Sequence, residues 1–270
     1  MRPGAAARLA GLLLAAAAPA GCRADPPPSP DSELTVFVAA SLLRPFEEIA
    51  AELERATPGL AVRLNAAGSQ QLARQLSLGA RAGVYASADE RWMQFARERG
   101  LVEPPVPLAR NRLAAVFADR PELSGMTLIN LASPGVKVVL AAPAVPLGRY
   151  AREALRKLGA ARGFGPDFAA RVEEAAVSLE QNSNAVTARI RLGEADAAIV
   201  YASDVRAADS TLRVVAIPEP YNVTATYPIA VVRGAEPAAP ARAFVAMATG
   251  PQGQAILARH GFMPADSTVP

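Results

Sequence analysis

The chain has 270 residues, of which 51% are hydrophobic and 20% are charged, and its formal net charge is +3 at pH 7. This composition is typical of a globular protein and excludes a disordered chain. One Cys and one His exclude an internal disulfide framework and a Cys- or His-based metal site. The basic residues form no tail or cluster, so nucleic acid is not an expected partner.

Residues 1-22 predict a signal peptide. This segment contains Arg2 and Arg8 and no acidic residue, so its removal lowers the formal net charge to +1. The apolar run from Leu9 to Ala18 is too short to span a bilayer, but it has the length of the h-region of a secretory signal. We therefore expect the mature protein to be exported.

The end of this segment is compatible with two alternative processing sites. Cleavage after Ala20 would release a soluble periplasmic form, whereas Ala20-Gly21-Cys22 resembles the end of a bacterial lipobox, in which the Cys becomes lipidated. Residues 23-32 are rich in proline and predict a stiff tether after that Cys. We favour the lipoprotein, anchored by Cys22 at the outer face of the cytoplasmic membrane.

The first half of the mature chain alternates between strand and helix patterns. Apolar residues at 46, 49, 50 and 53 have the spacing of one helical face. Three strand–helix units predict a parallel sheet covered on both faces. In chain order, the expected elements are a strand at 35–39, a helix through 46–53, a strand at 60–64, a helix from 70, a strand at 83–86 and a helix after Ser87-Ala88-Asp89 that ends at Gly100.

A second α/β series follows the proline-rich segment 104–107. Its expected strands are 112–117, 136–141, 176–178 and 197–201, with helices through 150–158 and from 183 to 193. Strands at 213–217 and 227–232 and two helices, 241–247 and 252–259, complete the chain. This extra strand and these helices suggest that the C-terminal segment rejoins the first half of the chain.

This order predicts an α/β protein of two lobes, each a mainly parallel sheet flanked by helices. Lobe I comprises residues 33-108 plus 225-264, and lobe II comprises residues 109-224. The chain would cross between the lobes near 107–112 and again near 220–228, which makes a hinge. The cleft between the lobes is the expected ligand site.

Uncharged hydrogen-bond donors stand at the junctions that precede several expected helices. Ser41 is a candidate N-cap of the first helix, and Ser69, Leu147 and Ser183 begin later ones. Tyr201 adds a hydroxyl at a strand end. Ligands of α/β sheets gather beyond the carboxyl ends of the strands, so these donors are expected to converge. Helix N-termini and hydroxyls can hold a small dianion without Arg or Lys.

Other interpretations stand beside this one. Each of these residues taken alone is more readily explained as a helix cap, a turn residue or a core phenol, and only the joint pattern favours a binding site. A Ser-dependent hydrolase would need a G-x-S-x-G or S-x-x-K motif, and neither occurs. The sole His, His260, falls at the end of the last helix, where it suits a C-terminal cation rather than a catalytic base. We therefore expect a binding protein and no enzyme.

Several collinear segments resemble the periplasmic molybdate-binding proteins of ABC importers, over residues 33–262. Those of the first lobe are Thr35-Val36-Phe37-Val38-Ala39-Ala40-Ser41-Leu42, Gly68-Ser69 with Leu72-Ala73-Arg74-Gln75, and Ser87-Ala88-Asp89 with Trp92-Met93. The match continues through 145–151, 153–155, 192–201, 227–232 and Gly261-Phe262. Because these motifs keep their order and spacing, the resemblance is specific.

The resemblance implies a type II periplasmic-binding-protein fold that closes on a tetrahedral oxyanion, molybdate or tungstate. It assigns a hydroxyl and a backbone N–H each to Ser41 and Ser69, backbone N–H groups to Leu147 and Ser183, and the phenol to Tyr201. Any metal would be present only as molybdate held by these residues. It further implies an ABC importer permease and its ATPase as partners, no cofactor, a periplasmic location and a monomer.

Gly83 and Ala141-Ala142-Pro143 depart from the family pattern, and so do two of the candidate site positions. Leu147 stands where a small residue is usual, and Ser183 stands where an aliphatic residue is usual. The matched positions offer donors only, which suits an anion without a proton, such as molybdate, tungstate or sulfate. A receptor for sulfate or another small oxyanion is therefore the alternative within the binding class.

Overall fold

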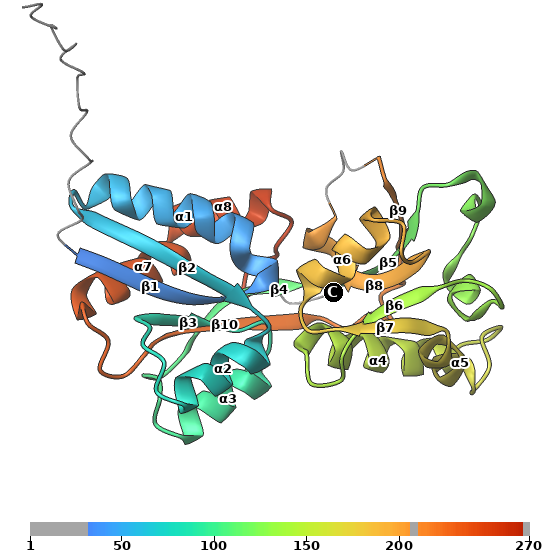
Figure 1. Ribbon diagram of the computed structural model, residues 1–270, viewed down its shortest axis with the longest axis horizontal. Helices are drawn as coiled ribbons and strands as arrows, with labels where there is room; N and C mark the ends of the chain where they lie inside the picture. Colours follow the sequence, from blue (N-terminus) through green and yellow to red (C-terminus); the bar gives the residue numbers. More distant parts are fainter. Residues whose placement is uncertain (1–31, 206–209, 267–270) are drawn as a thin grey trace, which may run out of the picture.

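The computed structural model describes residues 32–205 and 210–266, and it contains two lobes, each built on a five-stranded sheet (Figure 1). The sheet of lobe I has the order β2-β1-β3-β10-β4. Its strands are β1 (Ser32–Ala39), β2 (Leu60–Ala67), β3 (Val84–Ala86), β4 (Val106–Asn111) and β10 (Ala225–Val231). Helices α1 (Leu43–Ala56), α7 (Ala238–Thr249) and α8 (Pro251–Arg259) cover one face, and α2 (Ser69–Ser77) and α3 (Glu90–Glu98) cover the other.

The sheet of lobe II has the order β7-β6-β8-β5-β9. Its strands are β5 (Leu113–Ala118), β6 (Val138–Ala141), β7 (Ala176–Glu180), β8 (Ala197–Tyr201) and β9 (Leu212–Ala216). Helices α4 (Pro146–Gly159) and α5 (Phe168–Glu174) lie on one face, and α6 (Ser183–Arg191) lies on the other. Short 3-10 turns occupy Ala40–Leu42, Pro121–Leu123, Leu128–Ala132 and Ala202–Asp204.

Both sheets are mixed, so they are less parallel than the sequence predicts. In lobe I, β1 pairs with β2 and β3 in parallel, but β10 runs antiparallel to β3 and β4. In lobe II, β6 pairs with β7 and β8 in parallel, but β5 runs antiparallel to β8 and β9. The antiparallel strands are those next to the crossings, because each crossing sends the chain straight into the other sheet without a helix.

The two crossings between the lobes lie side by side. The first is at Arg112, between β4 and β5 and within the expected range 107–112; the expected lobe boundary at 108 falls inside β4, which stays paired with β10 as far as Asn111. The second lies between β9 and β10. The Asn222 side chain joins them, since its amide donates to the Leu113 carbonyl at 2.9 Å and its oxygen accepts from the Leu113 N–H at 3.1 Å.

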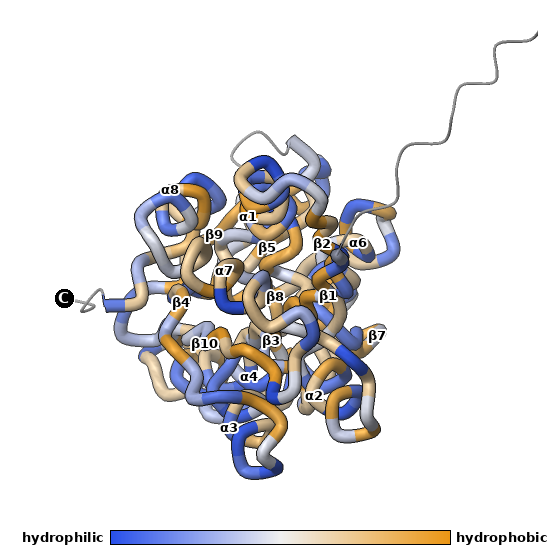
Figure 2. The backbone as a smooth tube through the Cα atoms, turned by 90° about the vertical axis from the view of Figure 1, so that its left-hand side faces the viewer, coloured by the Kyte–Doolittle hydropathy of each residue, from blue (hydrophilic) through white to orange (hydrophobic). Residues whose placement is uncertain are grey.

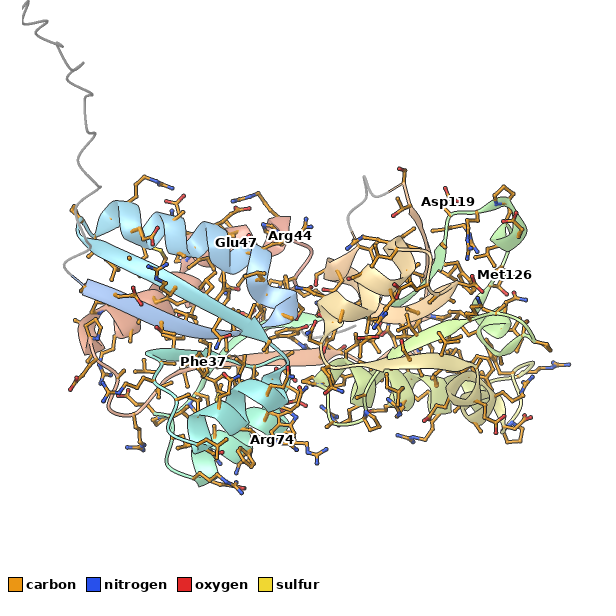
Figure 3. The ribbon with its side chains drawn as sticks, viewed as in Figure 1. Phe37, Arg44, Glu47, Arg74, Asp119 and Met126 are labelled. Atoms are coloured by element: carbon orange, nitrogen blue, oxygen red, sulfur yellow. The ribbon has the colours of Figure 1, made fainter. Side chains whose placement is uncertain are left out.

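The helical faces expected from the sequence are the ones that are buried. Phe46, Ile49 and Leu53 of α1 lie in the core, as their spacing predicts. An end-on view shows hydrophobic segments of the strands in the interior and hydrophilic segments on the outer turns (Figure 2). Charged side chains such as Arg74 and Asp119 lie on the outer surface (Figure 3). The core therefore follows from the sequence pattern.

The carboxyl ends of the parallel strands in each lobe point toward the other lobe (Figure 1), and they face the cleft in which both lobes line one cavity. Helices α2, α4 and α6 begin just after those ends, so their N-termini face the same cleft. The helix α5 was not expected from the sequence, and α4 begins at Pro146, earlier than the predicted apolar stripe. This arrangement places three helix N-termini around one point.

The predicted signal peptide, the Cys22 lipidation site and most of the tether lie outside the described residues. Within residues 32–205 and 210–266, no helix has both the length and the apolar character needed to cross a membrane.

Candidate functional site

A small cavity lies between the two lobes, and its walls contain every uncharged donor predicted from the sequence. Its free space is about 10 Å³, about what one water molecule needs, which leaves no room for a sugar or a peptide. None of the residues that line it is charged. They are Ala39, Ala40, Ser41, Ala67, Gly68, Ser69, Ala88, Val145, Pro146, Leu147, Asn182, Ser183 and Tyr201.

Ser41 lies in the wall of lobe I, but it does not cap α1 as the sequence predicts. A 3-10 turn over Ala40–Leu42 separates β1 from α1, so Leu42 occupies the N-cap position and makes no side-chain cap. The Ser41 hydroxyl instead lies 3.2 Å from the hydroxyl of Tyr227, a buried residue of β10. Ser41 is therefore held toward the cavity by a residue of β10 rather than by its own helix.

Ser69 forms the second part of this wall, at the first position of α2. Gly68 is the N-cap, and its N–H donates to the Gln71 side chain at 3.1 Å. The Ser69 hydroxyl accepts a hydrogen bond from the Ala88 N–H at 2.9 Å. Because this bond uses the oxygen as an acceptor, the hydroxyl proton remains free to donate into the cavity.

The start of α4 forms one part of the opposite wall. Pro146 is the first helical residue, so Leu147 is among the helix positions whose N–H has no intrahelical partner. Gly148 packs against the end of β6, where a Cβ would collide with the carbonyl groups of Ala141 and Ala142. The glycine thus lets the helix N-terminus approach the sheet edge closely enough to face the cavity.

Ser183 and Tyr201 complete the lobe II wall with two hydroxyls that lack a partner of regular geometry among the described residues. Asn182 caps α6 by accepting from the Ala185 N–H at 2.9 Å, so Ser183 is the first helical residue rather than the cap. Ser183 is 4% exposed and Tyr201 is 1% exposed. Neither hydroxyl makes a hydrogen bond of regular geometry with the described residues, although the Ser183 hydroxyl lies beside the Asp204 carboxyl and the Tyr201 hydroxyl beside that of Tyr227. Buried polar groups normally have one, so both hydroxyls point to a ligand.

Together these residues form a site for a small anion. Three helix N-termini bring free N–H groups and the positive ends of their dipoles to the cavity. Hydroxyls from Ser41, Ser69, Ser183 and Tyr201 can add donors. No carboxylate lines the cavity, so nothing there favours a protonated ligand. Within the residues that the structure describes, no cluster of three His, Cys, Asp or Glu residues is placed to hold a metal cation.

The profile of one protein family, described as bacterial extracellular solute-binding protein, matches residues 34–263. The chain belongs to this family. A molybdate-binding protein, ModA of Mycobacterium tuberculosis, is 35% identical to the chain over 230 residues, which is 85% of this chain and 84% of the relative. Membership agrees with the expectation of a binding protein that is not an enzyme.

Solved structures show the same fold. A periplasmic molybdate-binding protein of Azotobacter vinelandii superposes with a TM-score of 0.73 at 22% identity, covering 88% of this chain and 99% of that one. The sulfate-binding protein SubI of Mycobacterium tuberculosis superposes with a TM-score of 0.74 at 19% identity, covering 87% and 88%. The predicted two-lobed binding-protein fold is therefore confirmed.

A groove of about 750 Å³ adjoins the cavity of this solute-binding protein and shares Ala40 and Ser41 with it. The charged groups of the groove come from both lobes. They are Arg44, Glu48, Arg191, Asp204, Arg259 and His260. His260 ends α8, as the sequence predicts, and its Nε2 lies 2.6 Å from the Glu48 carboxylate. His260 thus belongs to a surface ion pair rather than to the cavity.

Asp204 is the acidic residue that approaches the cavity from this groove. It stands three residues after Tyr201 and accepts a hydrogen bond from the Tyr201 N–H at 3.4 Å. Burial raises the pKa of the Asp204 carboxyl from 3.8 to about 7. The Tyr201 amide, the Ser183 hydroxyl and then the positive charge of Arg191 oppose this shift without cancelling it.

We expect Asp204→Asn to make the stability of the solute-binding protein less dependent on pH. Between about pH 4 and pH 7, the folded protein keeps a proton on Asp204 that the unfolded chain releases, so the free energy of unfolding falls as the pH rises. Relative to wild type, the variant should gain about 1–3 kcal/mol between pH 5 and pH 8. Urea unfolding at several pH values measures this, and parallel pH profiles would contradict it.

Four side chains at the lobe interface were not recognised as functional from the sequence. Gln70, Trp92, Asn184 and Arg149 each reach across the cleft to the other lobe. Their partners are distant in sequence, and three of the four acceptors are backbone carbonyls. The sequence carried no signal for these contacts beyond the positions of Trp92 and Arg149 within the family-like motifs.

Proposed function

We propose that this protein captures molybdate, or the similar tungstate, between its lobes and delivers it to an ABC importer. The observation that carries the proposal is a small cavity between the lobes whose lining contains hydroxyl and helix N-terminal donors from both lobes and no charged residue. A relative that is 35% identical is named a molybdate-binding protein, which supports the same ligand here. No cofactor is needed, because molybdate is the cargo.

The assignment of roles follows the geometry of the walls. Ser41 and Ser69 each supply a hydroxyl and a backbone N–H from lobe I. Leu147 and Ser183 supply backbone N–H groups from the starts of α4 and α6, and Tyr201 supplies its phenol. The Ser183 and Tyr201 hydroxyls support this assignment, because neither has a regular hydrogen bond among the described residues and a bound oxygen would supply one.

The chemistry of the cavity favours an anion without a proton. Phosphate-like anions carry a proton part of the time near neutral pH, since the second pKa of a phosphate ester is about 6. A site for them benefits from an acceptor, and no carboxylate lines this cavity. Molybdate, tungstate and sulfate are dianions that need donors only.

Sulfate is the second candidate ligand. It shares the charge and the tetrahedral shape of molybdate, and a sulfate-binding protein has the same fold as this chain. At 19% identity that likeness concerns the fold alone, whereas the sequence relatives support molybdate. Direct titration with both anions separates the two assignments.

The proposed role places the protein outside the cytoplasm with a membrane permease and its ATPase as partners. We further propose that the lobes keep the expected bounds, 33-108 plus 225-264 for lobe I and 109-224 for lobe II, except that 109–111 belong to lobe I with the rest of β4. Lipidation of Cys22 would tether the protein near its permease, and it would act as a monomer.

We expect molybdate to stabilise the purified protein, while phosphate at the same concentration does not. A ligand that binds only the folded state at 100 times its Kd adds about 2.7 kcal/mol. For a chain of this size that raises Tm by about 5–10 °C. Thermal unfolding with sodium molybdate, tungstate, sulfate and phosphate, followed by isothermal titration, measures the preference. No shift with the first three anions would refute the proposed function.

A further inference from the structure

Four side-chain contacts cross between the lobes around the cavity. In none of them do both partners line the cavity. Three are hydrogen bonds from a neutral side chain to a backbone carbonyl of the other lobe. They are Gln70 Nε2 to the Gln181 oxygen at 2.8 Å, Trp92 Nε1 to the Ala144 oxygen at 2.9 Å, and Asn184 Nδ2 to the Ala40 oxygen at 3.0 Å. The fourth is an ion pair between Arg149 and Asp89 at 3.4 Å.

The ion pair differs from the other three because its acidic partner is buried. Asp89 is 1% exposed, and one of its carboxylate oxygens caps α3 by accepting from the Trp92 N–H at 2.9 Å. The other oxygen faces Arg149 of lobe II. Burial raises the pKa of Asp89, while the Trp92 amide and the Arg149 charge oppose that rise. Closure of the lobes thus brings a compensating charge to a buried carboxylate.

Arg149 is held in position to make this contact. Its guanidinium lies over the ring of Tyr150, 4.1 Å from the ring centroid, and its side chain is 35% exposed. Stacking on the ring limits the conformations that the long side chain explores before the lobes meet. The Tyr150 ring of lobe II therefore orients the guanidinium, which pairs with Asp89 of lobe I.

Both ends of the ion pair are linked to the walls of the cavity. Arg149 follows Leu147 by two residues on the first turn of α4, so it moves with the Leu147 N–H. Asp89 follows Ala88, whose N–H is bonded to the Ser69 hydroxyl. Pairing of the two side chains therefore fixes the distance between the two walls that contact the ligand.

We propose that Arg149 is a positioning residue for ligand retention, which holds the start of α4 against lobe I by pairing with Asp89 across the cleft. This inference rests on the proposed capture of an oxyanion between the lobes. Loss of the ion pair accelerates opening of the lobes. It leaves the rate at which the ligand encounters the open protein nearly unchanged. The dissociation rate constant should rise, and the association rate constant should stay within about three-fold.

Trp92 provides an internal signal for this test. It is the only Trp of the 270-residue chain, and its indole N–H donates across the cleft to Ala144. Opening of the lobes breaks that bond and exposes the indole to water, which changes its emission. Stopped-flow fluorescence therefore follows opening and closure without a label.

The experiment compares three variants of the full mature protein. Arg149→Met keeps the aliphatic stem and removes the charge, and we expect a dissociation rate constant for molybdate about 10-fold higher than wild type. Arg149→Lys restores a charge and should recover part of the retention. Arg156→Met is the matched control, because Arg156 is exposed on the same helix, and it should behave as wild type.

Two outcomes would overturn the inference: Arg149→Met releases molybdate at the wild-type rate, or Arg156→Met accelerates release equally. Urea unfolding of the ligand-free variants shows whether a change comes from lost folding instead. If molybdate does not bind but tungstate or sulfate does, the same rates are measured with that anion. Failure of the molybdate assignment is then distinguished from failure of the role given to Arg149.

Discussion

Replacing Ser69 with alanine is expected to weaken anion binding by about 10-fold or more and also to destabilise the ligand-free protein. The hydroxyl proton is directed to the ligand, and a hydrogen bond to a charged group contributes about 1.5–3 kcal/mol. The hydroxyl oxygen accepts from the buried Ala88 N–H at 2.9 Å. An alanine leaves that N–H without a partner, which costs about 1–3 kcal/mol of folding stability.

Tyr201→Phe is the matched comparison, because it removes a hydroxyl of the same cavity that makes no regular hydrogen bond with the described residues. The ring contact with Tyr227, with centroids 5.7 Å apart, is kept in the variant. We expect it to lose affinity while the ligand-free protein stays as stable as wild type. Isothermal titration and urea unfolding of both variants separate the two effects. A Ser69→Ala protein that lost stability but kept its affinity would show that Ser69 is only structural.

The sequence predicted the positions of the site better than their local geometry. Ser41, Ser69, Leu147, Ser183 and Tyr201 were identified because strand ends and helix starts converge in α/β sheets, and all five line one cavity. The predicted cap at Ser41 was wrong, since a 3-10 turn precedes α1. Tight turns of this kind depend on how a helix packs on its sheet, which the local sequence does not specify.

The contacts between the lobes could not be predicted from the sequence, for a different reason. Asn184 and Ala40 are 144 residues apart, and Gln70 and Gln181 are 111 apart. In these pairs a side chain bonds to a backbone carbonyl, which every residue type offers. The closing contacts to backbone carbonyls therefore have no residue-type signature, and they become visible only when the two lobes are placed together.

Gly68 offers a direct test of lobe closure. A Cβ at Gly68 would collide with the backbone oxygen of Gln181 in the other lobe and with the Gln70 side chain. The glutamine side chain can move away, but the backbone oxygen cannot move unless the lobes separate. Gly68 has φ −64° and ψ 139°, which alanine adopts without strain. Gly68→Ala should therefore leave lobe I folded and prevent full closure.

We expect Gly68→Ala to weaken molybdate binding by about 10- to 100-fold, because apparent affinity falls with the fraction of protein that can close. Its ligand-free stability should stay within about 0.5 kcal/mol of wild type. Gly148→Ala is the contrasting variant. Its Cβ would collide with carbonyl groups of Ala141 and Ala142 inside lobe II, so it should lose folding stability as well as binding. Wild-type affinity in Gly68→Ala would mean that the ligand is held without the closed contact at Gln181, and that the lobes grip the anion from further apart.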